Sequence, residues 1–489
     1  HLLHFLGELF FPEKDFGKKG LLFGAFLGFI ASILLLITFR QPLSTEIEWV
    51  KLGPLTLFIG ILLDSISLSF LFFLHLAYLV LAIYLPSQEE ESPLPLILPL
   101  LAFLSSLMVL SNQYFCYYLA IELIFLSIFL MLQSQKDLLP NQTYTLPSLI
   151  WKESLGFGSL MLWLSMGTLL NYAGSFRFSR LFNILGTNQW NSSLLTPANL
   201  QGNLFFSLFL FGAIFLKSGF FPFHRHLKEE RFLESPLFYP FLLMAVFPLV
   251  TYSLLRFHPL IAGYLYFSGN YFYHYSTLLG LLAWLTCLFT LIYSLYLLTI
   301  KKTRSFLLYS FYFYLSLVLF SFGISALQSA IFLIFLLPPL FLLLICGYPK
   351  KERLESLPFT RTHFFWVLGL LTSLFIPLYS ALYGKKGFLM EAYRDSIIHH
   401  SFPYYFVITL AALTIFFLSI SRIFWKTYLN PELPLEEGIK TLRIMPFLLA
   451  LCLLGGILLF GLFSLDQTVL KGAYDRVLLA SSQSFTFME

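Results

Sequence analysis

Charged side chains are scarce in this sequence. Asp, Glu, Lys and Arg make up 11% of the 489 residues, less than half of the roughly 25% that is typical of a soluble domain. Hydrophobic residues make up 58%, and the mean hydropathy of +0.81 excludes a soluble globular protein. Apolar runs of about 20 residues recur along the chain, and a helix of that length crosses the hydrocarbon core of a bilayer. The composition therefore predicts an all-α polytopic membrane protein.

Cysteine is scarce too. The four cysteines stand singly inside apolar segments, with neither the spacing of a metal site nor the pattern of a disulfide framework. We therefore expect no cofactor and no metal in this chain. The net charge of +5 comes from short loops between apolar runs, where it reports membrane topology and does not indicate a nucleic-acid partner.

Hydropathy predicts thirteen membrane spans. Each is expected to be a helix, because a backbone group left without a hydrogen bond in lipid costs several kcal/mol. The predicted spans are 21–39, 65–85, 94–110, 114–132, 151–170, 204–221, 238–255, 278–298, 306–322, 330–346, 364–383, 404–424 and 445–465.

Lys and Arg are distributed unequally between the two faces that these spans define. With Lys217 set aside, 19 lie on the N-terminal face and the other 10 on the opposite face. Cytoplasmic loops carry an excess of basic residues, so we expect the N-terminus in the cytoplasm or the matrix. The odd number of spans then places the C-terminus on the other side.

Glu122 is the clearest ionisable residue inside a predicted span. It lies eight residues after Tyr114, and its short side chain cannot reach either interface. A carboxylate in mid-membrane costs at least about 2.5 kcal/mol, so such a residue points to function. The alternative is a structural hydrogen bond to a neighbouring helix.

Lys217 is the second such residue. A lysine this close to the end of its span could also extend along its own stem to the interface. Gly219 and Pro222 follow directly, and they favour a break in the helix that frees carbonyl groups near the lysine. Transporters build ion sites from broken helices of this kind.

Two further residues carry weaker signals. Lys385 follows a span that contains Pro377 and ends near Gly384, but it could simply terminate that helix. His75 lies inside an apolar span, where a buried neutral imidazole is the ordinary role and a proton relay is the alternative.

The two interrupted spans, the sixth and the eleventh, are five spans apart. This odd offset inverts their direction in the membrane, so we expect two inverted five-helix repeats, each containing a broken helix. The predicted organisation is an N-terminal segment with the first helix and an extended loop (1–64), a second helix (65–93), the first repeat (94–257), the second repeat (258–426), and a C-terminal helix and tail (427–489).

Several motifs carry a resemblance to a known family. KSGFFPFH at 217–224 resembles the K-S-x-x-x-P-[FL]-H motif of the antiporter-like membrane subunits of respiratory complex I and of the related Mrp-type cation/proton antiporters. SLFIP at 373–377, with Lys385 eight residues on, is similar to the family's S-L-x-G-[FI]-P…K motif. Three shorter matches are Glu122 in AIEL, Arg256 at the end of the family's eighth helix, and RSFLLYS at 304–310.

The resemblance implies a membrane-arm subunit of an NADH:quinone oxidoreductase, resembling the subunit 2, 4 or 5 type, that couples redox energy to proton translocation. Glu122 and Lys217 would form an ion pair, and Lys385 would be the exit-side proton carrier. His75, His224 and Lys152 are candidates for a relay. The partners would be other membrane-arm subunits of a large hetero-oligomeric complex, together with lipid, in an energy-transducing inner membrane of a mitochondrion or a bacterium.

The stretch 242–250 departs from the family's pattern. It reads LLMAVFPLV and contains neither the Lys nor the His that the family usually has on this helix. Three alternatives therefore stay open: a cation/proton antiporter, the membrane subunit of an ion-driven inorganic-carbon accumulation complex, or a scaffold subunit that does not conduct.

The predicted topology is testable with single cysteines. Eight spans separate Lys14 from the loop 301–304, so cysteines introduced at both places should be labelled from the same side of sealed vesicles. Labelling from opposite sides would contradict the span count and the inverted repeat.

Lys385 and Lys386 provide a second test. If Lys385 is the exit-side carrier, Lys385→Ala should abolish proton pumping and leave assembly intact, whereas Lys386→Ala should be nearly silent. Pumping assays on the two variants side by side check this, and equal effects would mean that the motif spacing is misleading.

Overall fold

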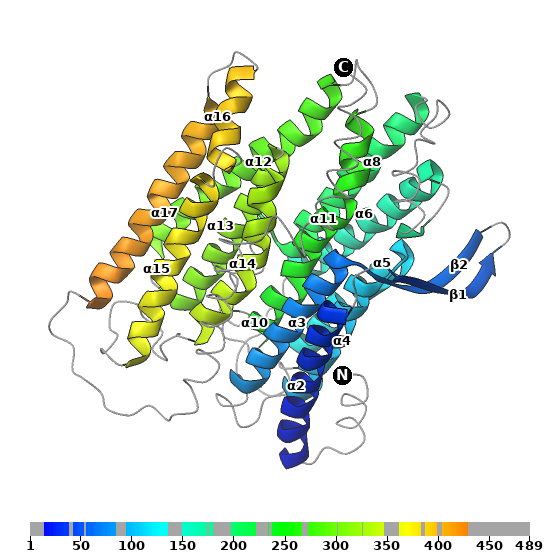
Figure 1. Ribbon diagram of the computed structural model, residues 1–489, viewed down its shortest axis with the longest axis horizontal. Helices are drawn as coiled ribbons and strands as arrows, with labels where there is room; N and C mark the ends of the chain where they lie inside the picture. The colour runs from blue at the N-terminus through cyan, green and yellow to red at the C-terminus, as the bar shows by residue number, and fades with distance from the viewer. Residues whose placement is uncertain are drawn as a thin grey trace. The chain divides into compact units, whose positions relative to one another are not determined.

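The computed structural model describes most of the chain. The described residues are 14–38, 43–52, 55–84, 94–134, 149–173, 176–178, 197–221, 233, 237–266, 272–300, 302–324, 326–346, 361–382, 387–398 and 403–428. They fall into two compact units that divide between Phe272 and Tyr273 (Figure 1).

The first unit contains a strand pair and a set of long helices. Its elements are α2 (Lys14–Thr38), β1 (Leu43–Leu52), β2 (Leu55–Leu63), α3 (Ser65–Tyr84), α4 (Leu94–Leu110), α5 (Tyr114–Ser134), α6 (Leu149–Ala173), α8 (Pro197–Ser218), α10 (Phe238–Pro240), the π-helix η3 (Phe241–Val246) and α11 (Phe247–Tyr266).

The described secondary-structure elements of the second unit are all helices. Its elements are α12 (Phe272–Thr299, which starts at the boundary), α13 (Thr303–Gly323), α14 (Leu327–Cys346), α15 (Arg361–Leu382), α16 (Phe388–Ile398) and α17 (Tyr404–Tyr428).

The helices confirm the predicted class of polytopic helical membrane protein. Every predicted span except 445–465 falls on a described helix, and the span 94–110 coincides with α4 at both ends. The span 445–465 lies outside the described residues. Within the described ranges, seven helices are long and apolar enough to cross a membrane: Gly20–Thr38, Ile66–Tyr84, Tyr114–Met131, Phe238–Phe257, Gly280–Thr299, Arg304–Gly323 and Tyr404–Ile423.

An antiparallel hairpin occupies the segment that the sequence predicts as an extended loop. β1 pairs with β2 from Leu43↔Leu63 to Leu52↔Leu55, with a bulge between Glu48 and Val50. In β1 the apolar side chains of Leu43, Ile47 and Trp49 are exposed, whereas Glu46 is less exposed. The hairpin lies at the end of the first unit where α3 and α5 begin (Figure 1), which we call the hairpin end.

Polar contacts fasten the hairpin to the helices. Glu46 accepts a hydrogen bond from Asn112 Nδ2 at 2.6 Å, and its other oxygen lies 3.1 Å from Arg177 Nη1. The Gln113 side chain accepts a hydrogen bond from the Phe58 backbone N–H at 3.1 Å. Within the hairpin, Gly60 permits the close approach of β2 to β1, because a Cβ there would lie 2.7 Å from the Thr45 carbonyl oxygen.

Both predicted interruptions lie in or next to described helices. α8 ends at Ser218, and Gly219 follows with a φ of 72°, a conformation that glycine adopts without strain. In the second unit α15 runs through Pro377 as far as Leu382, so this helix is not interrupted at the proline. α16 then begins at Phe388.

Neighbouring side chains satisfy the carbonyl groups that prolines leave free. Proline removes the N–H that would bond to the carbonyl four residues before it. For Pro377 that carbonyl belongs to Ser373, and the Tyr314 hydroxyl donates to it. For Pro248 it belongs to Met244, and Ser105 Oγ donates to it at 2.6 Å. Both helices therefore stay continuous through a proline in a dry environment.

Candidate functional site

Three helices of the first unit bring together the two charged residues that the sequence places inside predicted spans. Lys217 Nζ on α8 lies 3.0 Å from Glu122 Oε1 and 3.1 Å from Oε2 on α5. Ser159 on α6 completes the group, since its Oγ accepts from Lys217 at 2.9 Å and donates to Glu122 Oε2 at 2.7 Å. The predicted contact between Glu122 and Lys217 is therefore present.

The contacts around Lys217 compensate for the burial of its charge. The lysine side chain is 1% exposed, and a buried ammonium without partners would cost many kcal/mol. Its ammonium donates hydrogen bonds to Glu122 Oε2 and to Ser159 Oγ, and Glu122 Oε1 lies within ion-pair distance without accepting a hydrogen bond. The Phe125 ring adds a cation–π contact, with its centroid 5.2 Å from Nζ. Glu122 is more open, with 26% of its side chain exposed.

Gly158 makes room for the lysine stem. A Cβ at this position would lie 2.7 Å from Lys217 Cγ, closer than real atoms approach. The α6 backbone can therefore lie directly against α8 only because residue 158 has no side chain. Gly156, two positions earlier on the same helix, has nothing within 4 Å of where its Cβ would be.

The other sequence candidates do not join this group in the described part of the chain. His75 is buried on α3, and its Nδ1 lies 2.9 Å from the Leu71 carbonyl oxygen of the same helix. Lys152 lies on α6, and its side chain is not among those described. His224 and Lys385 lie outside the described residues.

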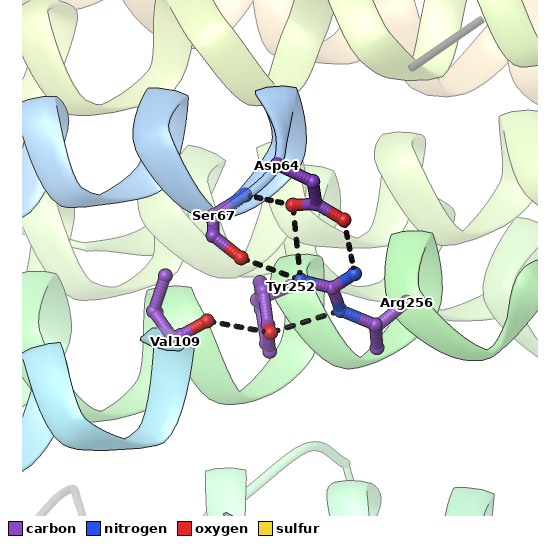
Figure 2. A network of polar contacts seen from close by, with 5 residues as sticks. All are labelled: Asp64, Ser67, Val109, Tyr252 and Arg256. Carbon is purple, nitrogen blue, oxygen red and sulfur yellow. Dashed lines mark hydrogen bonds and ion pairs between the residues drawn. The ribbon is translucent and has the colours of Figure 1, made fainter. Parts of the chain in front are cut away.

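A second ion pair lies at the hairpin end and was missed as a site by sequence reasoning (Figure 2). Arg256 on α11 donates to Asp64 through Nη1 at 2.6 Å and through Nη2 at 3.2 Å. Its Nη2 also donates to Ser67 Oγ at 2.6 Å, and its Nε donates to Tyr252 Oη at 2.9 Å. Tyr252 in turn donates to the Val109 carbonyl at 2.7 Å.

Asp64 is ionised in this network. Burial alone would raise the pKa of its carboxyl group, but the charge of Arg256 and hydrogen bonds from Arg256 and Ser67 lower the pKa below its ordinary value. Asp64 also caps α3, because Oδ1 accepts the Ser67 backbone N–H at 2.8 Å. An aspartate directly before an apolar run is the sequence signal that could have identified this capping role.

The helix that lacks the family's Lys or His is apolar at the corresponding positions. The π-helical residues Phe241–Val246 are all buried, and none of them is titratable. Within the described ranges, no group of three or more His, Cys, Asp or Glu lies close enough to hold a metal ion.

Comparisons with known proteins agree with this architecture. A family model described as NADH:quinone oxidoreductase/Mrp antiporter, TM, matches residues 111–399. No curated protein matches the chain in sequence.

Three solved structures contain chains of similar fold. They are the archaeal membrane-bound sulfane sulfur reductase (TM-score 0.72, 14% identity, 96% of this chain and 93% of that chain), respiratory complex I from Thermus thermophilus with bound NADH (TM-score 0.69, 16% identity, 96% and 94%), and the Mrp complex from Dietzia sp. DQ12-45-1b (TM-score 0.71, 14% identity, 99% and 96%). At these identities the likeness shows the fold alone.

The role of Gly158 is testable by substitution. Gly158→Ala should lower the stability of the detergent-solubilised chain by about 1–3 kcal/mol, because the new methyl group overlaps the Lys217 stem. Gly156→Ala is the matched control and should be neutral or slightly stabilising, since alanine favours helix. Thermal unfolding of both variants measures this.

A double variant identifies the atom responsible. Lys217→Ala removes Cγ, so adding it to Gly158→Ala should cost less than the sum of the single changes. Additive costs would show that the methyl group acts elsewhere on α8.

Proposed function

Since the chain belongs to the NADH:quinone oxidoreductase/Mrp antiporter family of transmembrane subunits, we propose that it is a proton-translocating membrane-arm subunit of an NADH:quinone oxidoreductase. It is a multi-pass protein of an energy-transducing membrane. The single observation that carries the proposal is the group formed by Glu122, Ser159 and Lys217 inside the first unit.

The Glu122–Lys217 pair can hold and release one proton. For opposite charges 3.0 Å apart, the Coulomb attraction is on the order of 5 kcal/mol at an effective dielectric constant of about 20. The attraction keeps the proton on lysine while the two side chains are in contact. Separating them removes this stabilisation and leaves a buried ammonium, which favours release of the proton.

Ser159 can bond to the Glu122–Lys217 pair both when the two side chains are in contact and when they are separated. Its hydroxyl accepts from the ammonium and donates to the carboxylate, so it can stay bonded to either side chain when the other moves away. The partly exposed Glu122 has more freedom to move than the buried Lys217, so we assign the movement to the carboxylate. In this proposal Lys385 receives the proton on the exit side, and the redox chemistry that drives the movement belongs to partner subunits.

The decisive experiment uses the complex that copurifies with the tagged full-length chain. After reconstitution into vesicles, Lys217→Ala and Glu122→Gln should each reduce proton pumping to the level of protein-free vesicles and leave the subunit composition unchanged. Lys51→Ala, at an exposed lysine of the hairpin, is the matched control and should pump normally.

Full pumping by Lys217→Ala would overturn the proposal and favour a scaffold role. The identity of the copurified subunits separates the oxidoreductase from the antiporter. Redox subunits support the oxidoreductase, whereas cation-dependent proton exchange without them would favour an antiporter.

A further inference from the structure

Six aromatic rings form a buried cluster between the hairpin end and the Glu122–Lys217 pair, and the proposed function does not use them. We call them the aromatic cluster: Tyr114 and Tyr117 on α5, Phe178 after α6, Phe206 on α8, and Tyr252 and Phe257 on α11. All six are buried.

The rings are packed in mutual contact. Phe257 is at the centre, with ring centroids 5.2 Å from Tyr114, 5.7 Å from Tyr117, 5.4 Å from Phe178 and 5.6 Å from Phe206. Tyr117 extends the contacts to Tyr252 at 6.3 Å, and Tyr114 touches Phe206 at 6.2 Å. Packed interiors of this kind leave few voids that could hold water.

The position of the cluster follows from two helices. Tyr114 precedes Glu122 by two turns of α5, or about 12 Å at a rise of about 1.5 Å per residue. Phe206 precedes Lys217 by eleven residues of α8, or about 16 Å on the same basis. Phe206 touches Tyr114 and Lys217 touches Glu122, so both helices run the same way from the hairpin end. The cluster therefore lies between the pair and that end.

The tyrosine hydroxyls in the cluster do not form a proton wire. Tyr114 bonds to Ser165, which donates to the Leu162 carbonyl at 2.6 Å. Tyr117 bonds to Ser253, which donates to the Leu249 carbonyl.

Tyr252 donates directly to the Val109 carbonyl. Each of these three chains ends on a backbone oxygen, which accepts a hydrogen bond but has no proton to pass on.

The Asp64–Arg256 pair fastens this cluster. Arg256 directly precedes Phe257 in sequence, and its guanidinium carbon lies 5.0 Å from the Tyr252 ring centroid and 5.8 Å from that of Phe178. Its bonds to Asp64 and Ser67 tie α11 to the start of α3. Arginine stays protonated at any relevant pH, so this contact does not titrate as lysine can.

We propose that the aromatic cluster is a proton-tight seal that closes the first unit at the hairpin end, held in place by Asp64 and Arg256. The proposal rests on the proposed function, because the seal matters for a proton held by Glu122 and Lys217. It prevents that proton from leaving toward the hairpin end and so directs it elsewhere in the chain.

Two adjacent phenylalanines on α8 provide a matched test. Phe206 is buried in the cluster, whereas Phe205 is 48% exposed on the outside of the unit. The intact complex in vesicles, with a membrane potential imposed and no redox substrate, gives the passive proton leak. Phe206→Ala should raise the leak several-fold, because the lost ring leaves a cavity beside polar hydroxyls that water can enter. Phe205→Ala should leave it at the wild-type level.

Conservative variants distinguish a seal from a conductor. Tyr117→Phe keeps the ring and removes the hydroxyl, so both the leak and pumping should stay at wild-type levels. Phe257→Leu is a milder change at the centre of the cluster and should also raise the leak. It replaces Phe206→Ala as the test if that variant impairs assembly. Equal leaks in Phe206→Ala and Phe205→Ala, or a loss of pumping in Tyr117→Phe, would overturn the proposal.

A double variant separates this proposal from the proposed function. If the leak passes through the ion pair, Lys217→Ala combined with Phe206→Ala should return it to the wild-type level. A leak that persists in the double variant would support the seal and contradict the route through Lys217.

Discussion

Hydrocarbon supplies no hydrogen bonds, and this constraint accounts for most of the polar contacts in the structure. Every buried donor, acceptor or charge must find its partner inside the protein. Tyr314 and Ser105 donate to carbonyl groups that lie four residues before a proline, on α15 and η3 respectively. Lys217 donates hydrogen bonds to Glu122 Oε2 and Ser159 Oγ, and the carboxylate of Glu122 balances its charge. These polar side chains therefore either satisfy a backbone carbonyl group or form a site.

Much of the fold could be predicted from the sequence because the constraint acts locally. A run of apolar residues must become a helix in lipid, so hydropathy located α4 at both ends. The hairpin at Leu43–Leu63 was predicted only as an extended loop. Its stability depends on Glu46 contacting Asn112 and Arg177, which are distant in sequence, and no local pattern records such contacts.

The two ion pairs differ in predictability for the same reason. Glu122 and Lys217 each lie within apolar sequence, so the sequence alone shows that each charge is costly to place in the membrane. The family resemblance supplied the pairing. Asp64 lies at the end of a predicted span. A carboxylate there costs little free energy and therefore does not by itself indicate a site. Its partnership with Arg256 joins residues 192 positions apart and appears only in the folded structure.

The Asp64–Arg256 and Glu122–Lys217 pairs differ in their cation, and this difference suits them to different functions. Arginine presents a rigid fork to a carboxylate and does not release its proton, and Arg256 uses that fork to hold Asp64 through two nitrogens. Lysine is a point charge that can become neutral when buried, so a pair made with Lys217 can change its charge state. The chain thus places an arginine where a permanent fastening is useful and a lysine where a proton could move. Because the segment Phe241–Val246 has no titratable residue, movement of a proton beyond Lys217 must depend on groups other than that helix.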